Sequence, residues 1–178
     1  GAEVHARESV VDWAPHGDGV RVRTAPASGP QVTYEADRLI VAVPFIDDAI
    51  PAIRRLATDG ISVAATLVYS AAQGILAAHA GASMVTISID TLDSVGGDSN
   101  GVIAALRAAF DHSGAECDVA AAGPITAASF AAAAGVGADV AIVTPVVLRG
   151  LLQHPLTDRG LDRFLSAISR RPKGKRGK

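Results

Sequence analysis

The sequence predicts an α/β fold built around a parallel β-sheet. Short runs of apolar, mainly β-branched residues recur along the chain, and a helical pattern follows each run. The composition agrees, because small residues dominate an apolar share of 49%, as suits helices packed closely on a sheet. Strands that alternate with helices form right-handed βαβ units with parallel strands. The 178 residues point to one domain with a sizeable core.

The first βαβ unit is the clearest. Residues 39–44 predict a strand, and Asp47 and Asp48 then begin a helix with apolar residues at helical spacing. That helix ends at Gly60, since glycine readily adopts the left-handed conformation of a helix end. A second buried strand follows at residues 61–69.

The next helix has signals at both ends, since Ser70 is placed to cap its start and Gly81 to end it. Three further strands follow, each again succeeded by a helical pattern. We expect these strands at residues 85–89, 118–122 and 138–143, and helices at residues 102–112, 126–134, 145–152 and 157–168. Five parallel strands therefore run from residue 39 onward.

The beginning of the chain has a different pattern, typical of an N-terminal β-meander. A turn signal at residues 16–19 precedes a cleanly alternating strand at residues 20–24. We therefore divide the chain into an N-terminal β-rich segment (1–38), a βα region (39–169) and a basic tail (170–178).

The charge of −2 is unevenly distributed. Six basic side chains lie in the last nine residues: Arg170, Arg171, Lys173, Lys175, Arg176 and Lys178. We expect this tail to be disordered. It could be an arm for RNA or a membrane surface, but we favour a solubilising terminus. The rest of the chain is acidic and aromatic residues make up 4%, so we expect no other nucleic-acid contact.

The cysteine and histidine patterns predict no metal and no cofactor. Cys117 is the only cysteine, which excludes a disulfide framework and fits a reducing, cytoplasmic location. The five histidines show no i, i+4 pair of the kind that binds zinc. No apolar run approaches a membrane-spanning length and no signal peptide is visible, so we expect no membrane partner.

Four segments carry a resemblance to a known family, and they read VAVPFIDDAIPAIRRL, GISVAATLVYSAAQGILAAHAGA, GADVAIVTPVVLRGLLQHPL and TDRGLDRFL. Over about residues 40–168 the chain resembles the transaldolase family, most closely its fructose-6-phosphate aldolase branch. The resemblance implies a (β/α)8 TIM barrel, whose strands four to eight correspond to the five strands predicted here. We therefore expect a partial or remodelled barrel. The resemblance also implies a sugar phosphate or a small hydroxy-ketone as ligand, and a homo-oligomer in which the C-terminal helix packs on a neighbour.

The same resemblance identifies a missing catalytic residue. The family forms a Schiff base on a lysine near the end of its fourth strand, within the pattern Val-Lys-Ile/Val-Pro, and this chain reads Val41-Ala42-Val43-Pro44 there. A Schiff-base lysine must lie inside the fold, partly desolvated. The only lysines of this chain are in the tail. We therefore expect a catalytically impaired relative, a pseudoenzyme without catalytic residues of its own.

Four further positions align with the family's substrate pocket. Thr66 matches a threonine that helps to hold the catalytic water, and Ser88 stands where the family has a tyrosine. Thr91 lies near the position of an arginine that binds the substrate phosphate, and Gly123 replaces a phosphate-binding serine. By resemblance these four residues are the candidate pocket.

Other patterns leave alternatives open. Asp90 and Asp93 follow a strand and could hold Mg²⁺ or act as acid and base, but we favour a solvated loop that caps the next helix. The Gly-rich residues 96–101 could bind phosphate with backbone N–H groups, but they lack the lysine of a P-loop.

Two further classes of function compete with the impaired enzyme. The first is a non-catalytic binding or structural subunit that completes its barrel in an oligomer, because an open sheet leaves strand edges to be covered. The second is a fragment of an FAD-dependent oxidoreductase, because residues 1–43 resemble part of an amine oxidase of the sarcosine oxidase type.

Overall fold

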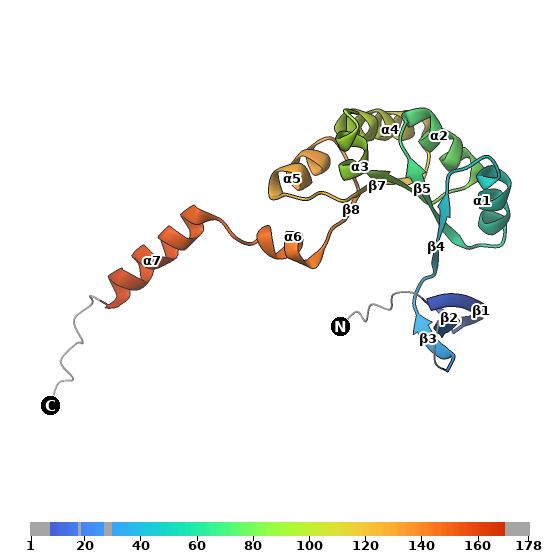
Figure 1. Ribbon diagram of the computed structural model, residues 1–178, viewed down its shortest axis with the longest axis horizontal. Coiled ribbons are helices and arrows are strands. Elements are labelled where there is room, and N and C mark those ends of the chain that lie inside the picture. Colours follow the sequence, from blue (N-terminus) through green and yellow to red (C-terminus); the bar gives the residue numbers. More distant parts are fainter. Residues whose placement is uncertain (1–7, 18, 27–29, 170–178) are drawn as a thin grey trace.

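The computed structural model describes residues 8–17, 19–26 and 30–169, and Figure 1 shows their helices and strands. The expected basic tail at residues 170–178 lies outside the described residues. In the part of the chain that is described, no helix is long and apolar enough to cross a membrane.

The centre of the fold is a parallel sheet of five strands, which confirms the predicted α/β class. The strands are ordered as they occur in the chain: β4 (Ile40–Pro44), β5 (Ser62–Val68), β6 (Met84–Ser88), β7 (Asp118–Ala122) and β8 (Val140–Ile142). Every neighbouring pair is parallel. Consecutive parallel strands as neighbours are the arrangement of a (β/α)8 barrel, and the five strands make up part of one.

Seven helices accompany the described strands. They are α1 (Ala49–Thr58), α2 (Ala71–Ala80), α3 (Ile89–Ser94), α4 (Ser99–Ser113), α5 (Ala127–Gly135), α6 (Pro145–Gly150) and α7 (Pro155–Ser169). Figure 1 shows α1, α2, α4 and α5 along one side of the sheet. On that side, alternate strand residues such as Val63, Val85 and Val119 form the buried core with Leu106 and Phe110 of α4. Small residues permit this close packing, since a side chain at Gly74 of α2 would collide with Leu106.

The opposite face of the sheet carries no helix of this core, and we call it the open face. Its residues alternate with those of the core: Ala42 of β4 lies opposite Ala64 of β5, and Thr86 of β6 lies opposite Ala120 of β7. Ala42 and Ile142, on the two outer strands, are exposed. Within the described ranges neither β4 nor β8 has a second neighbouring strand. On the face that would be the interior of a closed barrel, the outer strands are therefore accessible, whereas Ala64, Thr86 and Ala120 at its centre are buried.

The N-terminal meander forms a separate antiparallel sheet. Its strands are β1 (Glu8–His16), β2 (Gly19–Pro26) and β3 (Val32–Ala36), in that order. Arg21 and Glu35 lie directly opposite each other and form an ion pair of 2.8 Å. The described part of this sheet is not hydrogen-bonded to β4, so it does not extend the parallel sheet.

Helix ends follow the predicted signals in part. Ser70 accepts a hydrogen bond from the Gln73 backbone, and Gly81 ends α2 with φ +107°, both as expected. Asp48 stands at the start of α1 but makes no capping bond with its side chain. The strand expected at residues 138–143 is only three residues long, and Asp139 just before it makes side-chain bonds to α4 and β7.

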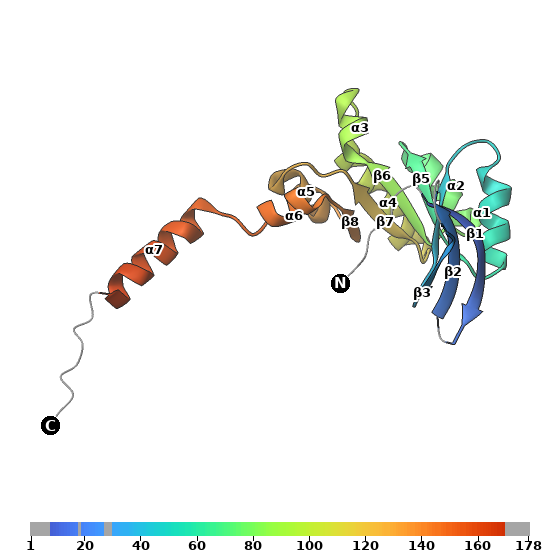
Figure 2. The ribbon, with the colours of Figure 1, turned by 60° about the horizontal axis from the view of Figure 1, so that its bottom comes forward.

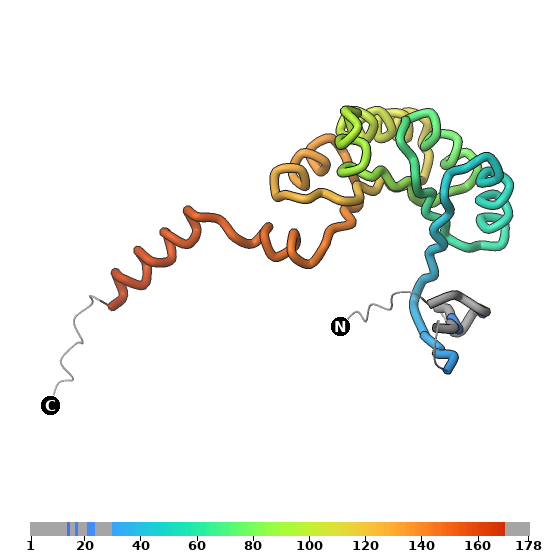
Figure 3. Tube along the Cα trace, viewed as in Figure 1, coloured from blue at the N-terminus to red at the C-terminus, as the bar shows by residue number. Residues whose placement is uncertain are grey.

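The last two helices leave the sheet. Figures 1 and 2 both show α7 leading away from it, and the trace in Figure 3 follows the chain from β8 through α6 to α7. No residue of α6 or α7 is buried. The apolar side chains of α7 at helical spacing are 50–61% exposed: Leu161, Phe164, Leu165 and Ile168. Among the described residues, this amphipathic helix therefore has no partner on its apolar side.

Candidate functional site

The candidate site lies at the carboxyl ends of the parallel strands, where the loops of a βα barrel gather. At the first two strands it contains Ala42 and Thr66. Pro44, two residues after Ala42, lies opposite Thr66, and the Phe45 backbone donates to the Thr66 carbonyl over 2.8 Å. Thr66 is half-buried. The alanine thus lies on the open face of β4 opposite Ala64, with Thr66 two residues further along β5, and it supplies no nucleophile.

The end of β5 has an irregular backbone that the sequence does not signal. Leu67 has φ +56°, and the pairing of β5 with β6 shifts between Ala65 and Val68. Left-handed backbone is uncommon for a residue with a side chain. As a result Leu67 is 50% exposed, although it belongs to an apolar strand.

A hydrogen-bonded group of three side chains stands at the end of β6. The Ser88 hydroxyl donates to Asp90 Oδ1 over 2.8 Å, and the Thr91 backbone N–H donates to the same oxygen over 2.8 Å. The Ser88 and Thr91 hydroxyl oxygens are 2.9 Å apart. Hydrogen bonds from Ser88 and then from the Thr91 backbone lower the pKa of the Asp90 carboxyl below its ordinary value. Asp90 is therefore a carboxylate at neutral pH.

Gly123, at the end of β7, completes this group. Its φ is +78°, and a Cβ added there would lie 2.7 Å from Asp90 Oδ1. Its own N–H donates to the Ile142 carbonyl of β8 over 3.1 Å. The structure thus brings together Ser88, Thr91 and Gly123, three of the four pocket positions expected by resemblance, around Asp90. None of the contacts described joins Thr66 to them.

Asp90 and Asp93 lie in a short helix, which corrects the expected loop. The helix α3 begins directly after β6; Ser88 precedes it without a side-chain capping bond, and the Asp90 side chain accepts from the Thr91 backbone N–H in its first turn. The expected helix-capping role is found for Asp93, whose Oδ1 accepts from the Ser99 backbone at the start of α4 over 3.2 Å. Asp98 caps α4 from the Gly-rich segment by accepting from the Gly101 N–H over 2.9 Å.

The capping bonds of Asp93 and Asp98 limit the phosphate and metal sites that the sequence left open at the carboxyl ends of the strands. The N–H groups of Ser99 and Gly101, which could have cradled a phosphate, are already bonded to carboxylates. In the described ranges, no group of three His, Cys, Asp or Glu side chains is placed to hold a metal ion.

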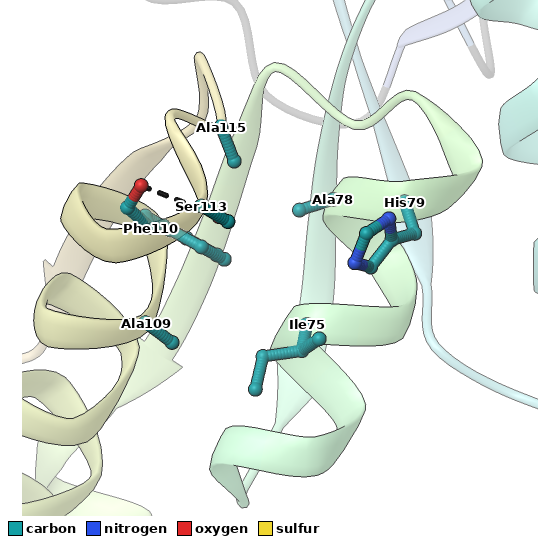
Figure 4. A pocket seen from close by; sticks show the side chains of 7 residues that line it. All are labelled: Ile75, Ala78, His79, Ala109, Phe110, Ser113 and Ala115. Carbon is teal, nitrogen blue, oxygen red and sulfur yellow. Dashed lines mark hydrogen bonds between the residues drawn. The ribbon is translucent and has the colours of Figure 1, made fainter.

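Two other features, a buried cysteine and an apolar hollow, lie away from the carboxyl ends of the strands. Cys117 is buried just before β7, and burial raises the pKa of its thiol to about 12. Between α2 and α4 is an apolar hollow of about 110 Å³, drawn in Figure 4, into which Ile75 and Phe110 project. The Ser113 hydroxyl at its rim donates to the Phe110 carbonyl over 3.3 Å. Neither feature carries a nucleophile towards the open face.

Comparison with known proteins agrees with the fold. Residues 28–172 match the family described as Transaldolase/Fructose-6-phosphate aldolase. A probable transaldolase of Ruegeria sp. (strain TM1040) is 39% identical over 145 residues, which cover 82% of this chain and 67% of the relative. A probable transaldolase of Maricaulis maris (strain MCS10) is 39% identical over 140 residues, with 79% and 64% covered. The chain thus spans about two thirds of the length of these relatives.

A parallel sheet with its strands in chain order and its helices on one side defines part of a (β/α)8 barrel, a class whose sites lie at the carboxyl ends of the strands. Within this class, the chain belongs to the transaldolase/fructose-6-phosphate aldolase family.

Proposed function

We propose that this chain is a catalytically impaired member of its family, which retains the fold but does not form the Schiff base. The observation that carries the proposal is Ala42, exposed on the open face of β4 where the family pattern has lysine. The three lysines of the chain all lie after residue 172. Imine formation needs an amine beside the bound carbonyl, and no residue between 40 and 168 can provide one.

The rest of the edge supports this proposal. Ser88, Thr91 and Gly123 bring two hydroxyls and a glycine together around a carboxylate, and none of them carries a positive charge. The ligand is a sugar phosphate or a small hydroxy-ketone, and the protein is cytoplasmic.

Trapping of an imine with borohydride tests the proposal. The chain is incubated with dihydroxyacetone and borohydride, and the adduct is read by intact mass and mapped by proteolysis. We expect no ligand-dependent adduct within residues 40–168 and no aldol turnover. Ala42→Lys restores an amine on the open face and gains an adduct at residue 42. Leu76→Lys on α2 is the control for nonspecific reaction, because the Leu76 side chain is exposed as well, at 51%. Turnover by the natural chain contradicts the proposal.

A second candidate is a non-catalytic binding or structural subunit in a homo-oligomer. The exposed apolar side of α7 favours it, because four large side chains at i, i+3, i+4 and i+7 have no partner within the described chain. Packing of α7 on a second copy would cover them. The flavin-dependent alternative stays a prediction that rests on residues 1–43.

A further inference from the structure

The apolar hollow between α2 and α4 is a space that the two helices cannot close, and Figure 4 shows it between them. The helices come close at Gly74 of α2, where an added Cβ would lie 2.5 Å from Leu106 of α4. About one turn further along each helix, Ala78 and Ala109 line the hollow, and their short side chains do not fill it. Because the contact at Gly74 fixes the separation of the helices, the space of about 110 Å³ is preformed.

The walls of the hollow are apolar. Ile75 of α2, Phe110 of α4 and Ala115 just after α4 complete them. The Ala115 N–H donates to the Phe110 carbonyl over 3.1 Å, which holds the end of the wall in place. A closed apolar cavity of about 150 Å³ takes up benzene. The hollow is smaller but open to solvent at its rim, where His79 and Ser113 are exposed, so it accepts one aromatic ring that keeps an edge in solvent.

The rim adds two hydrogen-bond acceptors, one from each helix. The Ser113 hydroxyl donates its proton to the Phe110 carbonyl over 3.3 Å, which leaves the Oγ lone pairs able to accept. The His79 ring makes no hydrogen bond or ion pair with another residue of the described chain, and a neutral imidazole has one accepting nitrogen. Among the described residues that line the hollow there is no lysine or arginine to bind an anion. The hollow therefore suits an uncharged ring that carries a hydrogen-bond donor.

We propose that this hollow is a second ligand site, for a small uncharged aromatic alcohol of the phenol class. The ring packs against Ile75 and Phe110, and the hydroxyl donates to the imidazole of His79, with Ser113 Oγ as the other acceptor at the rim. An apolar pocket with a few polar groups is the general form of a small-molecule site. The hollow lies on the helix side of the sheet, away from the carboxyl ends of the strands, so this ligand is separate from that of the proposed function.

Binding of phenol to the full chain tests the proposal, with benzene as the matched probe that lacks the hydroxyl. Binding is followed from the backbone amide signals of Ala78, Phe110 and Ser113 in ¹⁵N NMR spectra. The amide signal of Thr91, at the carboxyl ends of the strands, reports effects that do not come from the hollow. A shift that saturates at the first three positions and is absent at Thr91 places the ligand between α2 and α4.

Three variants distinguish binding in the hollow from binding elsewhere. Ala109→Leu extends a side chain into the hollow, and Ala108→Leu makes the same change at a neighbouring position that is exposed and does not line it. His79→Ala removes the proposed acceptor and leaves the apolar walls unchanged. Thermal unfolding of each variant establishes that it is folded before binding is measured.

We expect the natural chain to bind phenol with a dissociation constant of about 1 mM, and benzene more weakly. Ala109→Leu should abolish the shifts with both probes, and Ala108→Leu should leave them unchanged. His79→Ala should weaken phenol binding by roughly fivefold, as for the loss of one hydrogen bond, without effect on benzene. The inference is overturned by equal binding of phenol and benzene, by no shift with phenol, by phenol binding that survives Ala109→Leu, or by His79→Ala binding phenol as the natural chain does.

Discussion

Asp90 and Gly123 depend on each other across two neighbouring strand ends. The Asp90 carboxylate lies where a side chain at residue 123 would begin, 2.7 Å from the position of its Cβ, and Gly123 also has φ +78°. The loop after β7 therefore needs glycine for two reasons, its backbone conformation and the space occupied by Asp90. The hydrogen bonds of Asp90 to Ser88 and Thr91 hold the carboxylate in that space.

Gly123→Ala should destabilise the fold by about 1–3 kcal/mol, from left-handed strain together with the collision with Asp90. Unfolding in urea followed by circular dichroism measures this loss. Asp90→Ala combined with Gly123→Ala removes the collision but keeps the strain, so the double variant should lose less than the sum of the two single changes. Strict additivity would show that the two residues do not interact.

The exposed apolar side of α7 predicts self-association through this helix. Phe164→Asp places a charge on that side, and we expect it to shift the protein towards monomer in sedimentation velocity experiments. Ser166→Asp is the matched control, because Ser166 is also exposed on α7 but lies off the apolar stripe. If the natural chain is a monomer, or if both variants behave alike, α7 is not the contact.

Asp139 connects three elements and should matter more than its exposed neighbour Asp111. Its Oδ2 accepts from the Val119 backbone over 2.8 Å and from Arg107 over 2.9 Å. Asp139→Ala leaves a buried backbone N–H without its partner and should cost about 1–3 kcal/mol. Asp111→Ala removes only an exposed i, i+4 pair with Arg107 and should cost less than about 1 kcal/mol. Comparable losses in thermal and urea unfolding would contradict this ranking.

The buried thiol of Cys117 makes stability depend on alkaline pH. Its pKa is about 12 in the folded chain, against an ordinary value of 9.0, because burial disfavours the thiolate. Between these values the unfolded chain loses the proton first, so the contribution to stability is complete below pH 9 and is lost as pH approaches 12. Cys117→Ala should therefore lose less stability than the natural chain over this interval. Rapid reaction of the native thiol with a disulfide reagent at pH 8 would argue against burial.

The local sequence was sufficient for most of the strands and helices from residue 39 onward, and the resemblance to the family pointed to Ala42 at the position of its lysine. Strands and helices from residue 39 onward follow from runs of apolar residues and from helix signals such as Ser70 and Gly81, because these depend on neighbours within a few residues. Local signals did not predict α3, whose first turn has no side-chain cap from Ser88 and instead a bond from the Thr91 backbone N–H to the Asp90 side chain.

By itself the sequence determined the α/β class and the order of the parallel strands, which depend on residue type and spacing along the chain, while the resemblance to the family pointed to Ala42 as the position of its lysine. Only the tertiary structure decided that Ser88, Thr91 and Gly123 meet around Asp90, and that α7 keeps its apolar side exposed. The reason is physical: hydrogen bonds, close approach and burial depend on distances between elements that lie far apart in the chain. Asp90 and Gly123 are 33 positions apart in the sequence (123 − 90 = 33), and only the pairing of β6 with β7 brings them into contact.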